Sequence, residues 1–387
     1  MGASKKFEPN PAESTAKRMA EVRGEIDAVD KDILERLNRR AELSLEVGKL
    51  KAGNRDLIFK PFREREVIDK LIRENPGPLP SEHLRAVYRE IFSSSRSLQR
   101  PQKVGYLGPE GTFSYFAGLE FLGGSVDYRP MADIEEVFQA AAAREVELGV
   151  IPLENSLQGT VGQSLDCFLR YDVYIEAEIF CRISHSIFGR VEQLSQVKVV
   201  YSHPQPLAQC GGWLRANLPR AGIVPIESTA AAGRRVLEEP GSAAIGHKAL
   251  AQMLGLNVLA SGVEDQPDNW TRFVIIGSYK ADDPGDKTIR DKTSILFTLP
   301  DKPGALASIL NVLATNEINM KKLESRPMRG EKWKYVFFVD LECDLGQKQY
   351  EAVLKQLSEN CNTLRILGGY PSGPYLDFSG RGLSALR

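Results

Sequence analysis

A proline-free stretch from residue 12 to about residue 51 limits the possible folds of this 387-residue chain more than any other feature. Its apolar residues recur three, four or six positions apart, at Val22, Ile26, Val29, Ile33, Leu37, Ala41 and Val47. This spacing predicts one helix with a single apolar face. At a rise of about 1.5 Å per residue the helix would be about 60 Å long, longer than a small domain is wide. Such a helix needs a partner along its length, so the sequence predicts a homodimer or a higher homo-oligomer.

Two cationic side chains fall on the apolar face of this helix. At about 100° per residue, Arg40 lies in the middle of the face and Lys51 within roughly 20° of it. Either side chain alone could extend its charged group to solvent while its aliphatic part packs against the protein. Buried cations need an opposite charge, and the apolar stripe itself contains no acid. The pair therefore favours a small bound dianion over two solvated surface residues.

Two shorter helices are predicted next. Pro61 suits the first turn of a second helix, and the proline-rich residues 75–80 end it. A third helix places Leu84, Val87, Tyr88, Ile91 and Phe92 on one face. Ser95 and Gln99 continue this face at helical spacing and should point inward. Residues 93–101 are nevertheless polar enough to predict a linker.

From Lys103 onward, short β-rich runs alternate with helical patterns. The β-rich runs are residues 104–107, 126–128, 148–151, 173–180, 197–201, 222–226 and 273–276, and the helical patterns are residues 132–143, 206–217 and 229–238. This alternation predicts an α/β domain, which at about 180 residues can form two lobes around a cleft. Polar residues 281–292 read as a linker. The order of the last segment, βαββαβ, predicts a ferredoxin-like domain.

Polar motifs gather at the strand-to-loop junctions of the α/β segment. They are GYLGPEGTFS at 105–114, ENSLQGTV at 154–161, SHPQ at 202–205, ESTA at 227–230 and NWTRF at 269–273. Open α/β sheets bind ligands at such junctions. Each hydroxyl taken singly is more typical of a turn or a helix cap. His203, which precedes Pro204, is predicted to be structural rather than a general acid.

Several functions are disfavoured by composition. The five cysteines are scattered without a CxxC pair and predict reduced thiols, and the four histidines form no metal signature. Lys and Arg are interspersed with acids, which argues against nucleic acid. No apolar run approaches the roughly 18 residues of a membrane span, and the amino terminus lacks a secretory apolar region. We therefore expect a cytoplasmic protein that needs no cofactor and no metal.

The helical segment resembles the all-helical chorismate mutase family. The matching motifs are VRGEIDAVD at 22–30, RR at 39–40, EVGKLK at 46–51 and PFRE at 61–64. That family forms an intertwined dimer. The resemblance implies a catalytic set of Arg23, Arg40, Lys51, Arg63, Glu64, Ser95 and Gln99.

The resemblance also implies roles for these residues. Arg40 and Arg63 would hold the substrate carboxylates, and Arg23 would reach in from the other protomer. Lys51 and Gln99 would donate to the breaking ether oxygen, and Glu64 would bind the hydroxyl. A Claisen rearrangement needs a folded reactant and fixed donors rather than a nucleophile. Lys60 departs from the family, which commonly has Asp there.

The α/β segment resembles prephenate dehydratase, whose GPxGTFS, NSxxGxV, ESTAxA and NxTRF elements appear in that order. The family folds as two α/β lobes similar to periplasmic binding proteins, with the active site between them. Thr271 matches the catalytic threonine, which would donate a hydrogen bond to the leaving hydroxyl with help from Arg272. The implied substrate-binding residues are Thr112, Ser114, Asn155, Ser156, Ser228, Thr229, Asn269, Arg272 and Phe273.

The last segment resembles ACT regulatory domains through DKPGAL at 301–306 and LESRP at 323–327. In dehydratases of this type the two motifs bind phenylalanine across a domain–domain interface. The implied effector site comprises Gly304, Ala305, Leu306, Glu324, Ser325, Arg326 and Pro327. Taken singly, Gly304 could be only a turn and Arg326 only a surface ion-pair partner.

Together the three segments resemble bifunctional chorismate mutase/prephenate dehydratases with a carboxyl-terminal ACT domain. The expected domains are residues 12–98, 102–279 and 292–370. The expected activities are rearrangement of chorismate to prephenate and decarboxylative dehydration of prephenate to phenylpyruvate, with feedback by phenylalanine. Two alternatives stay open: a dehydratase whose helical domain only dimerises or senses, and a non-catalytic carboxylate-binding regulator.

Overall fold

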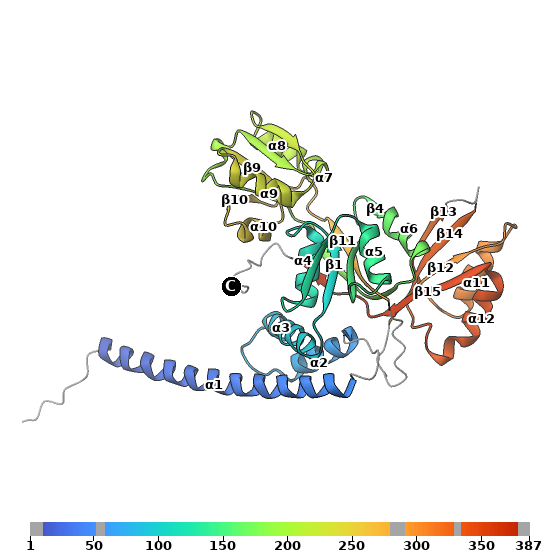
Figure 1. Cartoon of the computed structure of the whole chain (residues 1–387), viewed down its shortest axis with the longest axis horizontal. Helices are drawn as coiled ribbons and strands as arrows, with labels where there is room; N and C mark the ends of the chain where they lie inside the picture. Colours follow the sequence, from blue (N-terminus) through green and yellow to red (C-terminus); the bar gives the residue numbers. More distant parts are fainter. Residues whose placement is uncertain (1–10, 52–58, 279–290, 329–333, 378–387) are drawn as a thin grey trace, which may run out of the picture. The chain divides into compact units, whose positions relative to one another are not determined.

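The computed structural model describes residues 11–51, 59–278, 291–328 and 334–377 (Figure 1). It divides into two compact units. One contains the long first helix together with residues 98–100, and the other contains the remaining elements. Among the described residues, no helix combines the length and apolar content that a membrane-spanning helix needs.

The first unit is dominated by helix α1, Pro11–Lys51, which runs for 41 residues without interruption (Figure 1). This confirms the predicted long helix. Residues 98–100 belong to the same unit and lie against it at Gly48. A Cβ atom built on Gly48 would be 3.1 Å from the Cα of Gln99, so the absence of a side chain permits this close approach.

Two helices follow, α2 (Pro61–Glu74) and α3 (Ser81–Gln99). They belong to the second unit except for the last two residues of α3, which belong to the first. Pro61 occupies the first turn of α2 as predicted, because its missing N–H has no partner there anyway. The predicted linker at 93–101 is wrong, since α3 continues to Gln99. Packing explains the difference: Ser93, Ser95 and Arg96 are buried, and burial of one face stabilises a helix beyond what its residue propensities suggest.

The α/β segment folds as two lobes with a sheet each. The first sheet has the order β16-β5-β11-β3-β1-β2, with β4 paired to β3. Its strands are β1 (Lys103–Leu107), β2 (Asp127–Met131), β3 (Leu148–Asn155), β4 (Gly159–Thr160), β5 (Tyr174–Arg182), β11 (Trp270–Gly277) and β16 (Tyr375–Leu376). Helices α4 (Phe113–Leu122), α5 (Ile134–Ala142) and α6 (Gly162–Arg170) connect them.

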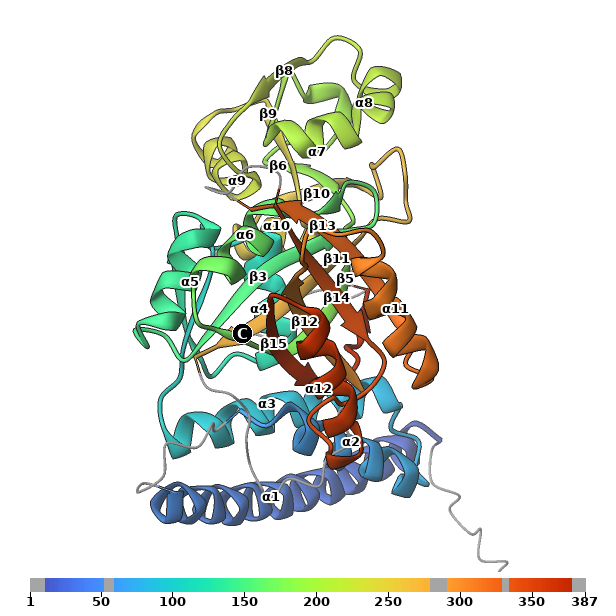
Figure 2. The ribbon, with the colours of Figure 1, turned by 90° about the vertical axis from the view of Figure 1, so that its right-hand side faces the viewer.

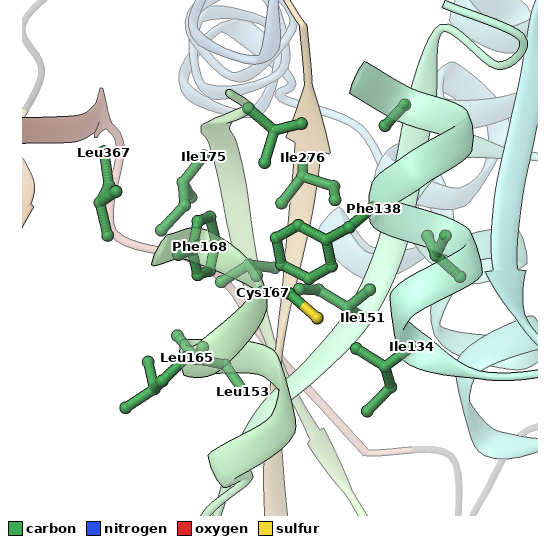
Figure 3. Close-up of a cluster of buried hydrophobic side chains, with 14 of the residues drawn as sticks. Ile134, Phe138, Ile151, Leu153, Leu165, Cys167, Phe168, Ile175, Ile276 and Leu367 are labelled. Carbon is green, nitrogen blue, oxygen red and sulfur yellow. The ribbon is translucent and has the colours of Figure 1, made fainter. Parts of the chain in front are cut away.

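Side chains from α5 and α6 meet the strands in a common core, which Figure 3 shows around Phe138 and Phe168. The two rings lie edge to face with centroids 4.9 Å apart. Ile151 and Ile276 line the strand side of this core. Leu367, from the last domain, belongs to the same cluster. The core therefore joins the first lobe to the carboxyl-terminal domain.

The second lobe has the strand order β10-β6-β9-β7-β8. Its strands are β6 (Ser186–Gly189), β7 (Val199–Ser202), β8 (Gly222–Pro225), β9 (Ser242–Gly246) and β10 (Asn257–Ser261), and its helices are η1 (Leu194–Gln196), α7 (Pro204–Gln209), α8 (Gly211–Asn217), α9 (Thr229–Glu238) and α10 (Lys248–Met253). The single helix predicted at 206–217 is instead two helices that divide at Cys210.

The last domain has the predicted ferredoxin-like order. It comprises β12 (Lys292–Thr298), α11 (Ala305–Thr315), β13 (Met320–Pro327), β14 (Tyr335–Leu341), η2 (Lys348–Tyr350), α12 (Glu351–Asn360) and β15 (Thr363–Tyr370). The sheet order is β13-β14-β12-β15. Figure 2 shows α11 and α12 beside this sheet. Ile309 of α11 and Leu357 of α12 belong to one hydrophobic cluster with Ile295 of β12. Leu296 and Phe338 belong instead to the core of the first lobe.

Candidate active site

The predicted motifs converge on one edge of each sheet. Strands β1 and β3 are parallel, so residues 108–112 and Asn155 lie at the same carboxyl edge. Strand β11 runs antiparallel to β3 and begins at this edge with Trp270 and Thr271. In the second lobe, parallel strands β7, β8 and β9 end just before His203, Ser228 and His247. These are the edges where open α/β sheets bind ligands.

Thr271 is held by Asn155 in a buried hydrogen-bonded group. Asn155 Oδ1 accepts hydrogen bonds from the backbone N–H groups of Leu157 (3.1 Å) and Gln158 (3.0 Å). This oxygen assignment makes the amide nitrogen the donor on the other side. That nitrogen donates to Thr271 Oγ1 at 3.0 Å and to Asn269 Oδ1 at 2.6 Å. Thr271 Oγ1 therefore accepts the hydrogen bond from Asn155.

Ser156 lies next to this group, is exposed, and forms hydrogen bonds with the backbone of Trp270. The N–H of Trp270 donates to its Oγ at 2.9 Å, and its own N–H donates to the carbonyl of Trp270 at 2.8 Å. Asn269 is only 1% exposed, and its carbonyl accepts from Ile183. Three of the predicted residues, Asn155, Asn269 and Thr271, are thus in direct contact.

The glycine-rich loop at 105–114 reaches across to the second lobe. Gly111 has φ +91°, and a Cβ built there would be 2.6 Å from Leu250 on α10. Thr112 is the N-cap of α4: its Oγ1 accepts from Tyr115 at 3.4 Å and donates to the carbonyl of Leu107 at 2.9 Å. Ser114, in the first turn, is buried. The threonine hydroxyl is therefore used for capping in this structure.

The second lobe contributes Ser228 and Thr229 at the start of α9. Ser228 Oγ accepts from the N–H of Ala231 at 3.0 Å and caps the helix. Thr229 is buried, 3.3 Å from the position of a Cβ on Gly246. Sequence reasoning missed a direct bridge between the lobes, in which Gln205 Nε2 donates to Gln158 Oε1 at 2.8 Å. Both glutamines lie within the quoted motifs, which is the signal that could have identified them.

The histidines of the second lobe lie in helix caps and against aromatic rings. His203 is the N-cap of α7 and accepts from Gln205 N at 3.3 Å, which agrees with its predicted structural role. Phe113 lies edge-on to His185 and His247. Burial lowers the pKa of His185, and burial together with His185 lowers the pKa of His247 to about 3. Both rings are therefore neutral near pH 7.

Two substrate-binding predictions on strand β11 are corrected by the structure. Successive side chains of a strand point to opposite faces, so Arg272 points away from the face that carries Thr271. Its guanidinium lies 2.7 Å from Glu178 and also contacts Asp340. Phe273 is 2% exposed and belongs to a hydrophobic core cluster. Arg272 therefore does not assist Thr271 directly, and Phe273 is a core residue.

The residues predicted for the helical site are only partly described. On α1, Arg40 is half-buried and Arg23 is exposed, and the side chain of Lys51 lies outside the described residues. Gln99 is half-buried and sits against Gly48, one turn from Lys51. These three residues of α1 and Gln99 belong to one compact unit.

The remaining helical residues belong to the second unit. Arg63 pairs at the surface with Glu66 at 2.8 Å. Glu64 pairs with Arg96, and Ser95 Oγ donates to the carbonyl of Ile91 at 2.7 Å. Arg96 is 2% exposed, which sequence reasoning missed because an arginine on a polar helical stretch looks solvated. The predicted contact of Glu64 with a substrate hydroxyl stays a prediction.

A cavity of about 430 Å³ in the second unit lies away from Thr271. It is bordered by α2, α3, β5 and the segment that leads into β16. The arginines on its wall already have acidic partners: Arg85 pairs with Asp69 at 3.3 Å, and Arg89 pairs with Glu120. The cavity offers an anionic substrate less attraction than its arginine content suggests.

Thiol and metal chemistry find little support in the described residues. The five cysteines are free, as predicted, and burial raises the pKa of Cys210 to about 12 and of Cys343 to about 11. Such thiols are protonated near neutral pH and are weak nucleophiles. Within the described residues, no group of three or more His, Cys, Asp or Glu side chains is arranged to hold a metal ion.

Three family models match consecutive parts of the chain. Residues 22–100 match chorismate mutase type II, residues 104–281 match prephenate dehydratase, and residues 293–361 match the ACT domain. A bifunctional chorismate mutase/prephenate dehydratase of Aquifex aeolicus is 41% identical over 91% of this chain and 98% of its own length. The chain belongs to the bifunctional chorismate mutase/prephenate dehydratase family. Both catalytic domains and the regulatory domain are present.

Solved structures agree with this assignment. A prephenate dehydratase of Arthrobacter aurescens in complex with L-Phe has a TM-score of 0.63 and 32% identity, covering 70% of this chain and 90% of that chain. GqqA, described as a novel type of quorum-quenching acylase, has a TM-score of 0.64 and 28% identity, covering 70% of this chain and 98% of that chain. Because similar folds can carry different activities, the full-length relatives rather than the fold decide the family.

The LESRP motif of this bifunctional enzyme lies on strand β13, and its residues alternate between the two faces of that strand. On β13, Lys322, Glu324 and Arg326 are half-buried, whereas Ser325 and Pro327 are exposed. Glu324 accepts from Thr160 at 3.1 Å, and Arg326 pairs with Asp166 at 3.1 Å. Strand alternation therefore points Glu324 and Arg326 to one face and Ser325 and Pro327 to the other. The place of these four residues in an effector site stays a prediction.

The other ACT motif lies at the start of α11. Gly304 is the N-cap of this helix and has φ +84°, a conformation that side chains with a Cβ rarely adopt. Ala305 is buried beneath it, and Leu306 packs partly against the core of the ACT domain. Gly304 therefore makes the predicted tight turn, and its place in an effector site stays a prediction.

Proposed function

We propose that this enzyme converts chorismate to prephenate in its helical domain and prephenate to phenylpyruvate between the two α/β lobes, with Thr271 as the catalytic residue of the second step. The proposal further includes a cytoplasmic homodimer or higher homo-oligomer and feedback by phenylalanine through the ACT domain. The observation that carries the dehydratase role is the oriented hydrogen bond from Asn155 to Thr271 at 3.0 Å.

The donor role of Thr271 follows from the geometry of that hydrogen bond. Asn155 is locked as a donor because its oxygen already accepts from two backbone N–H groups. Thr271 Oγ1 must then accept, which leaves its single hydrogen for a ligand. Prephenate loses hydroxide and carbon dioxide as its ring aromatises. A fixed O–H directed at the departing oxygen stabilises the charge that develops there.

Burial strengthens this hydrogen bond. Thr271 is 7% exposed, and Asn155 and Asn269 around it are also buried. A polar interaction in such an environment is worth more than in water, since the effective dielectric constant is lower. The neutral amides leave the hydroxyl uncharged, so it donates a hydrogen bond rather than transferring a full proton ahead of bond breaking. Donors for the substrate carboxylates would come from the N–H groups at residues 112–114 and from the hydroxyls of Ser114, Ser228 and Thr229.

The decisive dehydratase test is Thr271→Ala. We expect phenylpyruvate formation to fall by about 100- to 1000-fold, the usual range for removal of a preorganised donor. Chorismate mutase activity of the same preparation should remain, and Thr271→Ser should retain a measurable part of the dehydratase rate because it keeps the O–H. Near-normal phenylpyruvate formation by Thr271→Ala would refute the assigned role.

For the mutase site we propose that two copies of α1 pair along their apolar faces. In the single chain Ile26 is 53% exposed, Val29 56% and Ile33 48%. A row of exposed apolar side chains of this kind is typical of an interaction surface. Arg40, Lys51 and Gln99 would bind the substrate of one site, joined by Arg63 and by Arg23 of the partner helix. Ser95 would orient the bound substrate, and Lys60 would remain outside the site.

The alternative of a dehydratase with a non-catalytic helical domain is tested directly by the reaction products. Pure protein incubated with chorismate should first accumulate prephenate and then phenylpyruvate. Dehydratase activity on supplied prephenate, without chorismate consumption beyond the spontaneous rate, would support the dimeriser or sensor. Binding of prephenate without any product would support the carboxylate-binding regulator.

For regulation we propose that phenylalanine binds the ACT domain and inhibits the dehydratase. The support is the Arthrobacter aurescens dehydratase, solved with L-Phe, together with the GAL and ESRP motifs. Because strand β13 presents its ESRP residues on two faces, a complete site would draw residues from two ACT domains. Phenylalanine should lower the rate of phenylpyruvate formation from prephenate. An unchanged rate at saturating phenylalanine would contradict this proposal.

A further inference from the structure

Helix α3 buries an arginine, a residue type that is rarely buried without a partner. The side chain of Arg96 is only 3% exposed, although it lies in the polar last turns of the helix. A buried guanidinium is stable only when acceptors and an opposite charge surround it. The contacts of Arg96 therefore show which groups this position holds.

Each of the three nitrogen atoms of the Arg96 guanidinium has an acceptor. Nη1 donates to the carboxylate of Glu64 on helix α2, and the two side chains form an ion pair. Nη2 donates to the carbonyl oxygen of Leu122, and Nε donates to Gln102 Oε1 at 3.2 Å. Cζ lies 5.5 Å from the centroid of the Phe59 ring. The buried charge is therefore paired with Glu64 and hydrogen-bonded at every nitrogen.

Two of these acceptors lie on well-packed parts of the first lobe. Leu122 is the last residue of α4 and is 1% exposed, and Gln102 directly precedes β1 and is 3% exposed. A Cβ built on Gly123 would be 2.6 Å from the Cβ of Ser93, so α3 and the end of α4 are in close contact. This packing leaves Arg96 little freedom to move.

The shape of the guanidinium transmits this order to Glu64. Its N–H groups form a planar, rigid fork, so fixing two of them fixes the direction of the third. With Nε bonded to Gln102 and Nη2 bonded to Leu122, Nη1 points to the place where the Glu64 carboxylate lies. The Glu64 side chain is 21% exposed, against 3% for Arg96. The glutamate is therefore held from its buried side while part of its surface stays accessible.

We propose that Arg96 is a positioning residue for the mutase reaction. By holding the Glu64 carboxylate in one place, it orients the group that we expect to bind the hydroxyl of chorismate. An acceptor that is fixed before the substrate arrives loses less entropy on binding, so its hydrogen bond contributes more to the reaction. This inference rests on the proposed mutase activity and on the role of Glu64 in it.

The test is a double-mutant cycle in the full-length enzyme. Glu64→Gln removes the carboxylate charge, Arg96→Met removes the guanidinium, and the double variant combines them. If Arg96 acts through Glu64, the two losses will not add, because the second substitution removes an interaction that is already broken. A merely structural role would give additive losses. The mutase kcat and KM for chorismate are measured on each variant, and the dehydratase rate on supplied prephenate shows that the preparation is folded.

Two further variants complete the experiment. Arg96→Lys keeps the positive charge but loses the planar fork, and it replaces Arg96→Met in the cycle if that variant does not fold. Arg89→Met is the matched control. Arg89 of α3 is 18% exposed, pairs with the carboxylate of Glu120 on α4, and donates to the carbonyl of Glu120 at 3.3 Å. Its removal loosens the same contact between α3 and α4 but leaves the pair of Arg96 and Glu64 in place.

We expect Glu64→Gln and Arg96→Met each to lower the mutase kcat/KM about tenfold, the scale of one hydrogen bond to a charged group. The double variant should lose less than about threefold more than either single variant. Arg96→Lys should fall between the wild type and Arg96→Met, Arg89→Met should match the wild type, and all dehydratase rates should stay within about twofold.

Four results would overturn the proposal: additive losses, wild-type mutase activity in Arg96→Met or Arg96→Lys, an equal loss in Arg89→Met, or a parallel loss of dehydratase activity. Wild-type mutase activity in Glu64→Gln is a different outcome. It would show that the role of Glu64 itself is wrong, and the positioning role of Arg96 would fall with it.

Discussion

Helix α1 has one apolar face and strand β11 is apolar along most of its length, yet their apolar residues lie in opposite environments. Val274, Ile275 and Ile276 of β11 are completely buried within one chain. Ile26 and Ile33 of α1 remain about half exposed, at 53% and 48%. Among the described residues, the chain covers β11 with its own helices and sheets but leaves the apolar face of α1 about half exposed, the face along which we propose that two copies pair. The dehydratase site can therefore form in a single chain, whereas the proposed mutase site requires two.

The largest effect should come from breaking the predicted pairing of α1. Ile33→Glu places a charge in the middle of the apolar face, and burying an unpaired charge is prohibitively costly. We expect monomeric helical domains and a loss of mutase activity of more than about 100-fold, because the helix partner supplies Arg23. Dehydratase activity should stay within about twofold. Light scattering and both assays on the same sample measure the result.

Asn38→Glu is the matched control for this substitution. Asn38 is exposed and lies about 140° around the helix from Ile33 at about 100° per residue. It introduces the same charge on the opposite face and should leave association and mutase activity unchanged. Full mutase activity in Ile33→Glu would show that the helical site is complete in one chain, and the contrast with β11 would disappear.

A second effect concerns the stability of the buried charge group behind β11. Although burial alone would raise the pKa of Asp340, Arg272 and Lys292 outweigh it and lower that pKa. Asp340→Asn leaves two buried cations with one acid, which should lower the free energy of unfolding by about 3–5 kcal/mol. Urea unfolding at pH 7 measures the loss. Asp172→Asn, which removes an 82% exposed partner of Arg365, should cost less than about 1 kcal/mol.

The pH dependence of the free energy of unfolding tests whether the charge of Asp340 causes this loss of stability. A carboxyl whose pKa is lower in the folded state contributes stability above its unfolded pKa of about 3.9, and this contribution is lost as the pH falls below that value. The unfolding free energies of wild type and Asp340→Asn should therefore differ at pH 7 and converge below about pH 4. A constant difference across this range would show that the charge of Asp340 is not its source.

A third pair of substitutions tests the hydrogen bond from Asn155 to Thr271. Asn155→Ala removes the donor to Thr271 and should lower the dehydratase kcat about tenfold, since the hydroxyl becomes free to rotate. Asn155→Asp should be worse, about 100-fold, because the carboxylate accepts the O–H that is needed for the substrate. The two kcat values, with the mutase rate as internal control, measure this order. Asn155→Asp more active than Asn155→Ala would mean that Thr271 does not act as a donor.

Much of the fold could be predicted because the spacing of apolar residues along the sequence shows which face of a helix or strand is buried. The long helix, the α/β alternation and the ferredoxin-like order all followed from spacing. Strands β6, β9 and β10 were missed because short runs such as SAAIG have few β-branched residues and gain their stability from neighbouring strands. Site motifs were recognisable for a related reason: each is a local turn or cap beside a strand.

The direction of a side chain and its distant partners could not be predicted in the same way. Arg272 was assigned to the substrate because it belongs to the NWTRF motif that also contains Thr271. Its partner Asp340 is 68 positions away, and nothing local indicates that contact. The burial of Arg96 could not be predicted for the same reason. Its partner Glu64 is 32 positions away, and Arg96 is buried only because a whole face of its helix is packed. Buried ion pairs depend on tertiary structure, which one-dimensional patterns do not encode.

The smallest effect tests whether the turn before α11 is shaped by backbone geometry alone. Gly304 has φ +84°, but a Cβ built there meets no atom within 4 Å. Gly304→Ala should therefore add backbone strain without a clash, lowering the free energy of unfolding by about 1 kcal/mol. If the turn also contacts phenylalanine, inhibition should weaken severalfold while uninhibited dehydratase activity is unchanged. Gly255→Ala, with φ +65° and equally open space after α10, is the control for strain without an effector site. Equal loss of inhibition in both variants would mean that the ACT turn responds to general destabilisation rather than to effector contact.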